Sequence, residues 1–340
     1  MKAIPKAIDL FAGCGGCTVG LKASGFRVVG AVEIDARASG VYTLNHPEVH
    51  LWQKDITRVS VTQMRRILGL KSGELDLLAG CPPCQGFSSV RTLNRKSAVR
   101  DKRNDLVFQF ERLIVGLRPK AVMLENVPGL AANQRFARFR ARLRKLGYVV
   151  NAKILDAADY GVPQRRRRLI LLAGRTAIPF GRKQVPPSVR DTIAGLPRAG
   201  SSGDPVHDLP EKRSAHIMKL IKLIPKDGGS RSALPRRMQL PCHRRCKGFC
   251  DIYGRLAWDR VAPTLTTGCF NPSRGRFLHP RENRAITMRE AALLQTFPPG
   301  YKFPVELGKL AIASMIGNAL PPEFIRRHAE SVLACLSAHP

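Results

Sequence analysis

Cys84 lies where a thiol could act as a nucleophile. The apolar run from Leu75 to Ala79 predicts a strand, and Gly80-Cys81-Pro82-Pro83-Cys84 follows it directly. Two prolines restrict φ to about −65° and remove two backbone donors, so the turn before Cys84 is stiff. Residues 90–103 then carry six basic residues and one acid, and cationic surroundings lower a thiol pKa from its free value of about 8.5. The pattern predicts a reactive thiolate at the end of a strand.

Other roles for the cysteines remain open at this point. Cys81 and Cys84 have the spacing of a redox pair, and together with Cys14 and Cys17 they could bind zinc. A thioredoxin-like pair should open a helix at its second cysteine, whereas a polar segment follows Cys84. A buried, inert pair is the third alternative. A further group lacks the usual CxxC spacing, so we expect no metal there; its members are Cys242, His243, Cys246 and Cys250.

Three predicted strands end in residues that suit a nucleoside-containing cofactor. They are Ala7–Phe11 followed by the glycine-rich turn 12–18, Arg27–Val32 followed by Glu33-Ile34-Asp35, and His50–Gln53 followed by Asp55-Ile56. Glycines let a backbone approach a ligand closely, and an acid after the second strand binds ribose hydroxyls in α/β folds. The third acid suits an exocyclic amine beside an apolar face. The alternatives are a dinucleotide-binding turn and, for Glu33 and Asp55, solvated loop acids.

Later segments continue this alternation of buried strands and amphipathic helices. We expect helices at Leu106–Leu117, Phe136–Leu146, Thr287–Gln295 and Glu323–Leu336, and strands at Ala121–Leu124, Tyr148–Leu155 and Arg168–Leu172. Glu125 follows the first of these strands, and Gln164-Arg165-Arg166-Arg167-Arg168 leads into the last. Such an arginine run is often only a solvated face. Thr287 and Glu290 have the spacing of a capping box.

The composition points to a polyanionic partner. The chain has 340 residues, 44% of them hydrophobic, and a net charge of +32. Its basic residues are spread over the whole length, and no apolar run approaches the roughly 20 residues that span a bilayer. Nine cysteines without a secretory signal indicate reduced thiols in a cytosol-like compartment. From Thr176 to about Pro280, prolines, glycines and basic residues dominate, which indicates a second, smaller region.

Taken together, these motifs closely resemble those of the cytosine-C5 DNA methyltransferases of the single-chain bacterial kind. The matching segments keep the family's order from Ile8 to about Val332; they are DLFAGCGG at 9–16, GCPPCQGFS at 80–88, ENV at 125–127, QRRRR at 164–168, RAITMREAALLQTFP at 284–298 and GNALPP at 317–322. The resemblance implies an α/β fold with a Rossmann-like S-adenosylmethionine-dependent methyltransferase sheet. This domain would span residues 1–175 and be completed by about 305–340, with a smaller irregular target-recognition domain and hinge at 176–304. Glu323–Leu336 would supply the helix that normally precedes the first strand.

The resemblance also implies roles in catalysis, on a cytosine extruded from the duplex. Cys84 would add to C6 of the cytosine, which makes C5 a nucleophile toward the donor's methyl group. Glu125 would meet the charge that develops at N3, and Arg166 would pair with the ring carbonyl or with that carboxylate. Gln164 and Arg168 would support the loop and the extruded nucleotide. An adenine-N6 or cytosine-N4 methyltransferase would have an aromatic residue after Pro-Pro, where this chain has Cys84.

Cofactor and DNA contacts are implied in the same way. The expected cofactor residues are Phe11, Gly13, Gly15 and Gly16 at the methionine part, Glu33 at the ribose, Ile34, Asp55 and Ile56 at the adenine, and Pro83, Leu106 and Asn318 completing the pocket. The expected DNA contacts are Ser88, Arg91, Lys96, Arg100 and Arg165. Cys14 and Cys17 depart from the larger apolar residues of many relatives. Side chains that read the target sequence are expected between about Leu234 and Arg276.

The partners follow from this reading. We expect double-stranded DNA as the substrate and S-adenosyl-L-methionine as the methyl donor. We expect a monomer in the bacterial cytoplasm, associated with the nucleoid and not with a membrane, and a cognate restriction endonuclease is a candidate partner. A tRNA cytosine-C5 methyltransferase is the alternative function. A DNA-binding module without catalysis would not need Cys84 and Glu125 at these positions.

Overall fold

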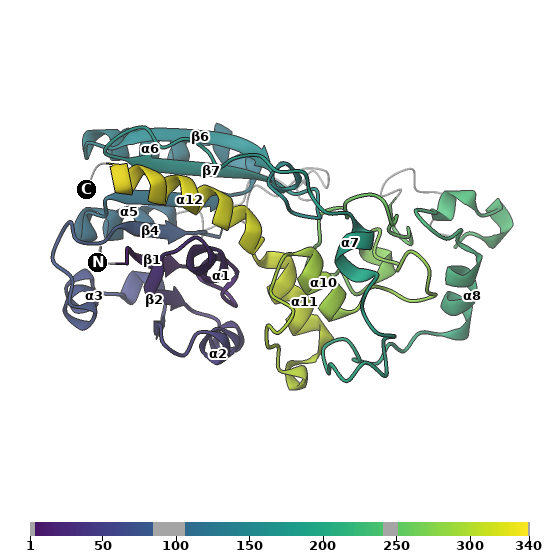
Figure 1. Ribbon diagram of the computed structural model, residues 1–340. Coiled ribbons are helices and arrows are strands. Elements are labelled where there is room, and N and C mark those ends of the chain that lie inside the picture. Colours follow the sequence, from purple (N-terminus) through teal and green to yellow (C-terminus); the bar gives the residue numbers. More distant parts are fainter. Residues whose placement is uncertain (1–3, 84–105, 241–250, 339–340) are drawn as a thin grey trace. The chain divides into compact units, whose positions relative to one another are not determined.

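The computed structural model describes residues 4–83, 106–240 and 251–338, and the chain forms two compact units (Figure 1). The sheet unit contains residues 1–160, 167–184 and 320–340, and the second unit contains residues 161–166 and 185–319. These units divide the chain after residues 184 and 319, and the domain boundaries expected near 175 and 305 stay predictions. Residues 161–166 belong to the second unit because Arg165 N donates to Ala262 O (2.8 Å) and Ala262 N donates to Pro163 O (2.9 Å).

A seven-stranded sheet organises the sheet unit. In chain order the strands are β1 (Lys6–Leu10), β2 (Arg27–Glu33), β3 (His50–Gln53), β4 (Leu77–Gly80), β5 (Ala121–Asn126), β6 (Val149–Asp156) and β7 (Arg167–Gly174), and their order across the sheet is β3-β2-β1-β4-β5-β7-β6. The first five pair in parallel, and β7 runs antiparallel between β5 and β6. The predicted Rossmann-like α/β sheet is confirmed. In such sheets ligands bind at the carboxyl ends of the strands, where the strand order reverses.

Helices cover both faces of this sheet. They are α1 (Gly16–Ala23), α2 (Ala36–Asn45), α3 (Val61–Leu68), α5 (Leu106–Leu117), α6 (Gln134–Lys145) and α12 (Pro322–Ala338), with 3₁₀ turns η1 (Ile56–Arg58), η4 (Pro128–Ala132) and η5 (Ala157–Asp159). Ile8 and Leu10 of β1 share a core with side chains of α3, α5 and α6. Asp9 between them accepts a hydrogen bond from Thr18 of α1. Because successive strand residues face opposite sides, α1 lies on the face opposite α5 and α6.

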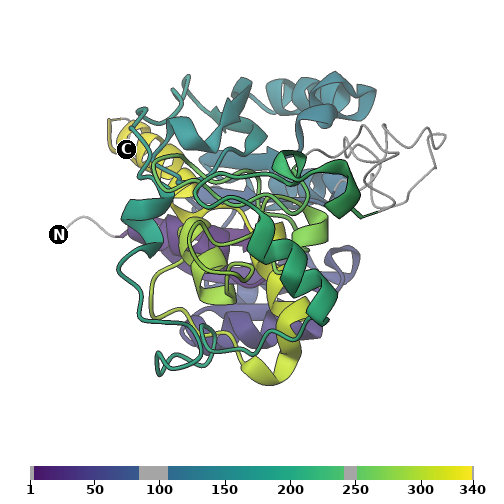
Figure 2. The same cartoon turned by 90° about the vertical axis from the view of Figure 1, so that its right-hand side faces the viewer.

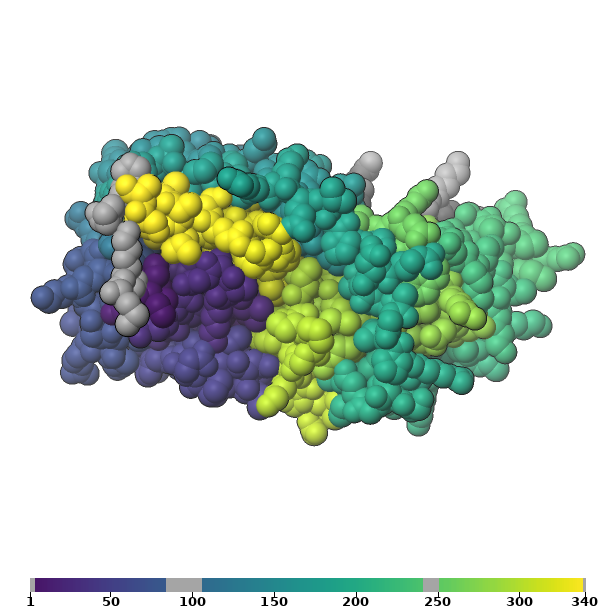
Figure 3. Space-filling view, viewed as in Figure 1, coloured from purple at the N-terminus to yellow at the C-terminus, as the bar shows by residue number. Residues whose placement is uncertain are grey.

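The C-terminal helix α12 packs directly on α1 (Figure 3). A Cβ atom at Gly20 would lie 2.4 Å from Pro322 O and 2.6 Å from Ile325 Cβ, so the two helices approach this closely because residue 20 has no side chain. His328 of α12 is buried between Tyr160, Phe180 and Phe324, and its Nδ1 accepts a hydrogen bond from Gly181 N (2.9 Å). The last helix is thus an integral part of the sheet unit.

The second unit, seen end-on in Figure 2, has little regular structure in its described residues, as its composition predicts. Its helices are α7 (Val189–Ile193), α8 (Ala215–Leu223), α10 (Met288–Leu294) and α11 (Gly308–Asn318), with 3₁₀ turns η6 (Arg231–Ala233), η7 (Arg236–Met238), η8 (Pro272–Arg274) and η9 (Val305–Leu307). The predicted capping box at Thr287 and Glu290 is confirmed: each side chain accepts from the other residue's N–H.

A buried arginine connects loops of the second unit through hydrogen bonds to their carbonyl groups. Arg255 is fully buried, and its guanidinium donates to the carbonyl oxygens of Ile221, Ile224, His279 and Glu282 and to the side chain of Asn283. One planar cation with five N–H donors can satisfy several carbonyls that no strand ladder reaches. Nothing in the local sequence pattern sets Arg255 apart from the other basic residues, so its role emerges only from the fold.

Candidate active site

The sheet register brings three functional segments to one edge. Leu10 of β1 lies opposite Gly80 of β4, and Gly80 lies opposite Leu124 of β5. The residues that follow, Phe11, Cys81 and Glu125, therefore lie side by side at the carboxyl ends of the three strands. Asn126 fixes this arrangement, because its buried side-chain amide donates to Pro82 O (2.8 Å). The segment that leads to position 84 is thereby tied to β5 next to Glu125.

Several predicted site residues lie outside the described residues. They are Cys84, Ser88, Arg91, Lys96 and Arg100, together with the four members of the Cys242–Cys250 group. The described chain stops at Pro83, directly before the predicted nucleophile. Within the described ranges, no group of three His, Cys, Asp or Glu side chains is arranged to hold a metal ion.

Arg168 forms an ion pair with Glu125. Its Nε lies 2.8 Å from Glu125 Oε1, and the carboxylate is only 8% exposed. The antiparallel register explains the pairing: Ile170 lies opposite Glu125, so Arg168, two residues away, has its side chain on the same face of the sheet. The expected pairing of Arg166 with the ring carbonyl or the carboxylate stays a prediction. Glu125 itself lies within β5 and not after it.

Gln164 and Arg166 hold backbone segments of the second unit. Gln164 Oε1 accepts from Leu265 N (2.9 Å), and its Nε2 donates to Gln295 Oε1 (2.5 Å). The two terminal nitrogens of Arg166 donate to Leu265 O (3.0 Å) and Gly317 O (2.9 Å). Both side chains are buried, whereas Arg165 is exposed. The arginine run is therefore more than a solvated face, because its alternate members are internal.

The turn after β1 has an unusual backbone. Phe11, Gly13 and Gly15 have φ of 59°, 55° and 98°, in the left-handed region that L side chains rarely adopt. Glu33 at the end of β2 stabilises this turn, because Gly13 N donates to its Oε2 and Ile34 N donates to its Oε1, both at 2.8 Å. A Cβ at Gly13 would meet nothing within 4 Å, so the space beside the turn is open. Strain of this kind concentrates at ligand sites.

The residues expected around an adenine differ in exposure. Asp55 caps η1, and hydrogen bonds from Thr57 N and Oγ1 hold the pKa of its carboxyl below the ordinary value. Ile34 is 64% exposed beside Glu33, whereas Ile56 is 3% exposed and belongs to the core. An apolar face for a base can therefore come from Ile34. The expected place of Ile56 at the adenine stays a prediction.

The remaining expected cofactor residues are spread over both units. Gly16 is the first residue of α1, Leu106 is the half-buried first residue of α5, and Pro83 is half-buried after β4. Asn318 is the last residue of α11 in the second unit. Gly16, Leu106 and Pro83 therefore lie in the same unit as Glu33, whereas Asn318 belongs to the second unit.

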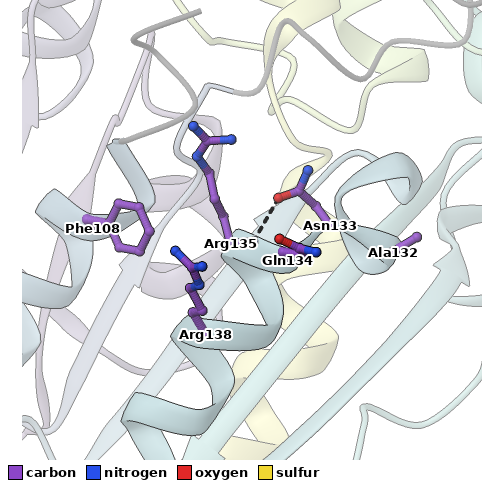
Figure 4. A pocket seen from close by; sticks show the side chains of 6 residues that line it. All are labelled: Phe108, Ala132, Asn133, Gln134, Arg135 and Arg138. Carbon is purple, nitrogen blue, oxygen red and sulfur yellow. Dashed lines mark hydrogen bonds between the residues drawn. The ribbon is translucent and has the colours of Figure 1, made fainter. Parts of the chain in front are cut away.

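A separate pocket of about 510 Å³ lies between α5 and the start of α6 (Figure 4). It is lined by Phe108, Ala132, Asn133, Gln134, Arg135 and Arg138, none of which the sequence predicted as a site residue. Asn133 caps α6 by accepting from Arg135 N (2.8 Å). Two arginines beside a helix N-terminus give this pocket a positive potential.

Comparison with known proteins decides the family. A family model described as C-5 cytosine-specific DNA methylase matches residues 5–334. The chain belongs to this family. As a C-5 cytosine-specific DNA methylase it transfers a methyl group to cytosine in DNA, and the function predicted from its motifs is confirmed. No described helix of this methylase is long and apolar enough to cross a membrane.

The sequence similarity to individual relatives extends over nearly the whole methylase. It is 34% identical to the type II methylase M.HgiDII of Herpetosiphon aurantiacus, across 96% of this chain and 94% of the relative. It is 32% identical to the type II methyltransferase M1.HphI of Haemophilus parahaemolyticus, across 96% and 86%. Among solved structures, a candidate DNA modification methyltransferase encoded within an E. coli prophage has the same fold, with a TM-score of 0.75, 24% identity and coverage of 98% and 99%.

Proposed function

We propose that this methylase uses S-adenosyl-L-methionine to methylate C5 of one cytosine within a specific sequence of duplex DNA. The observation that carries the proposal is the edge formed by Phe11, Cys81 and Glu125, with Asn126 holding Pro82 and Arg168 holding Glu125. A nucleophile one residue after Pro83 would then work beside a carboxyl group and an open cofactor turn.

The residues at the ends of β1, β2 and β3 fit an S-adenosylmethionine molecule. The open space beside Gly13 would admit its methionine part, with Phe11, Gly15 and Gly16 around it. Glu33 accepts three backbone N–H groups, yet a carboxylate has about four acceptor sites, so it can also bind a ribose hydroxyl. Ile34 offers an exposed apolar face for the adenine, and Asp55 an acceptor for its amine. When bound, this cofactor supplies an electrophilic methyl group.

The protein's own groups act on the cytosine. Cys84, as a thiolate, forms a bond to C6, and the electron pair displaced toward N3 makes C5 nucleophilic. Glu125, in its protonated form, donates a hydrogen bond to N3 and so stabilises the charge that develops there, while Arg168 holds the carboxyl group in place. Loss of the C5 proton to a base and expulsion of Cys84 then restore the aromatic ring. Gln164 and Arg166 act indirectly, by ordering the segments at Leu265 and Gly317.

Sequence selection is assigned to the second unit. Its loops are rich in arginine, and a net charge of +32 suits a partner with a phosphate backbone. Ser88, Arg91, Lys96, Arg100 and Arg165 would contact that backbone. We further propose a monomer that works at the nucleoid of a bacterial cytoplasm beside a cognate restriction endonuclease, as the type II names of its relatives suggest.

A methylation assay with a labelled donor tests this function. The wild type should label duplex DNA and leave tRNA unlabelled, and bisulfite sequencing should place every modified cytosine in one recurring sequence. Cys84→Ser should lose methyl transfer yet bind donor and DNA, because a serine hydroxyl is not ionised enough to add to C6. A duplex with 5-fluorocytosine at the target should trap a covalent complex with the wild type only. Labelled tRNA, or an active Cys84→Ser, would refute the proposal.

A further inference from the structure

The pocket between α5 and α6 lies in the sheet unit and has no part in the chemistry above. Its volume is about 510 Å³ (Figure 4). Phe108 lines it from α5, and residues 132–135 and Arg138 line it from the segment that begins α6. Two of these six side chains are guanidinium groups, and none is a carboxylate. A pocket of this composition suits an anion.

The two arginines direct their charge to one side of α6. Arg135 and Arg138 are three residues apart, so they share a face of the helix, and Figure 4 shows both extending in the same general direction. Arg138 is exposed, and among the described residues no carboxylate pairs with it. Glu111 of α5 pairs instead with Arg142, whose Nε lies 3.2 Å from Glu111 Oε1. Phe108, which packs against the core, provides an apolar wall, and like charges beside such a wall focus the field on an entering anion.

The pocket lies at the same edge of the sheet as Glu125. α6 follows β5 and leads into β6, whose first residue Val149 lies opposite Gly174 of β7. Gly174 also lies opposite Ala121, the first residue of β5. α6 therefore begins at the carboxyl end of β5, where Glu125 lies, and ends at the amino end. α5 likewise leads into the start of β5, so its first turn, with Phe108, lies at the carboxyl edge as well.

The chain length limits how far the pocket can be from the proposed catalytic carboxyl. Arg135 follows Glu125 by ten residues, since 135 − 125 = 10. An extended chain spans at most about 3.6 Å per residue, so the two Cα atoms lie within about 36 Å of each other. This distance is about one turn of a DNA duplex. A duplex whose target cytosine is at Glu125 therefore has backbone phosphates at this distance on both sides of the target.

We propose that this pocket binds a backbone phosphate of the duplex that flanks the target cytosine, with Arg135 and Arg138 as its cations. The inference rests on the proposed function, in which Glu125 acts on a cytosine of duplex DNA. The side-chain amides of Asn133 and Gln134 can donate further hydrogen bonds to phosphate oxygens. Contacts to the backbone fix the register of a protein on the duplex and carry no sequence information, so the pocket positions the DNA without selecting the sequence.

The first test measures the affinity for DNA at several salt concentrations. The probe is a duplex of about 30 base pairs with the methylated sequence at its centre, which extends about 50 Å to each side. Arg138→Ala should reduce the slope of log affinity against log salt by about 0.9, a factor of about 3.5 between about 50 and 200 mM salt. It should leave the methylated sequence unchanged. This variant should fold, because Arg138 is exposed on a helix and alanine has the highest helix propensity.

Arg144→Ala is the matched control. Arg144 is also exposed on α6, but it lies in the last turn, at the opposite edge of the sheet, and does not line the pocket. The slope for Arg144→Ala should equal that of the wild type. A wild-type slope for Arg138→Ala would overturn the inference.

The second test locates the phosphate. A methylphosphonate removes the charge of one phosphate, and it is placed at each position of both flanks in turn. The wild type should lose affinity at a flanking position where Arg138→Ala loses none, with a coupling of at least about twofold. Arg144→Ala should lose affinity there as the wild type does.

The outcomes separate this inference from the proposed function. Equal losses for the wild type and Arg138→Ala at every position would overturn the inference, while methylation of the duplex by the wild type would leave the proposed function intact. A pocket that takes only a free anion would give this same result, with inorganic phosphate still protecting Arg138 from an arginine-modifying dicarbonyl reagent. A wild type that does not methylate the duplex would refute the proposed function and, with it, the inference.

Discussion

Arg168 Nε lies 2.8 Å from Glu125 Oε1, across the antiparallel pair of β7 and β5. Within β7, the parity of the strand places Arg168, and not its neighbour Arg167, on the face of the carboxyl group. Arg167 is exposed. The catalytic chemistry proposed here therefore depends on the register of two strands.

Arg168→Ala should impair both stability and rate. Removing one partner of a largely buried ion pair leaves the other charge uncompensated, at a cost of about 3–5 kcal/mol. Arg167→Ala, one residue away on the exposed side of β7, should change neither by more than about 0.5 kcal/mol. Urea unfolding and single-turnover methylation measure the two effects. Equal stability of the two variants would show that the pair contributes little.

Gly20→Ala should loosen the contact between α1 and α12. The added methyl would lie 2.4 Å from Pro322 O, and overpacking of this kind costs about 1–3 kcal/mol. Gly40 in α2 meets nothing within 4 Å, so Gly40→Ala should be neutral or stabilise by up to about 1 kcal/mol through helix propensity. Thermal unfolding of both variants is the measurement. A stabilised Gly20→Ala would mean that the two helices adjust without strain.

Asp9 should make the protein less stable as pH rises. Burial raises its pKa to about 7, above the ordinary value of 3.8, so between these values the folded state holds a proton that the unfolded state has lost. This stability is present in full below pH 3.8 and is lost as pH rises toward 7, by roughly 4 kcal/mol in all. Asp9→Asn should lack this dependence. The measurement is urea unfolding of the wild type and of Asp9→Asn at several pH values. If the stabilities of the two proteins changed with pH in parallel, the carboxyl of Asp9 would be ionised throughout and the prediction would be wrong.

His328 should make the protein less stable as pH falls. Burial lowers its pKa from 6.5 to about 3, so between these pH values the unfolded state binds a proton that the folded state does not bind. The stability from neutral His328 is present above pH 6.5 and is lost as pH falls toward 3. His328→Asn keeps an acceptor for Gly181 N but cannot titrate. The stability gap between wild type and this variant should narrow in acid, and a constant gap would contradict the buried neutral imidazole.

Salt should weaken DNA binding steeply. For about 6–10 phosphate contacts, affinity should fall by roughly 10³- to 10⁵-fold between about 50 and 200 mM salt. Lys96→Ala or Arg100→Ala should reduce the slope by about one, without changing the methylated sequence. Lys71 precedes β4 and is exposed at the opposite edge of the sheet, so Lys71→Ala should leave the slope unchanged. A salt-independent affinity would refute the phosphate contacts.

Local patterns in the sequence determined the elements and their order. Apolar runs and periodicity predicted α5 at its observed bounds and β1, β2, β4 and β5 within two residues, and the spacing of Thr287 and Glu290 predicted the cap of α10. These features depend on interactions within a few residues, so the chain specifies them without its distant parts. The motifs likewise identified the family, because each of them is a short contiguous segment whose residues and order are visible in the sequence itself.

Only the tertiary structure decided which distant side chains meet. The pairing of Arg168 with Glu125 depends on the register of β7 against β5, and the hydrogen bond from Asn126 to Pro82 depends on β4 lying beside β5. The packing of the chain also decides that Ile34 is exposed, whereas Ile56 and Arg255 are buried. These outcomes arise from packing and strand parity between remote segments, which no local spacing encodes.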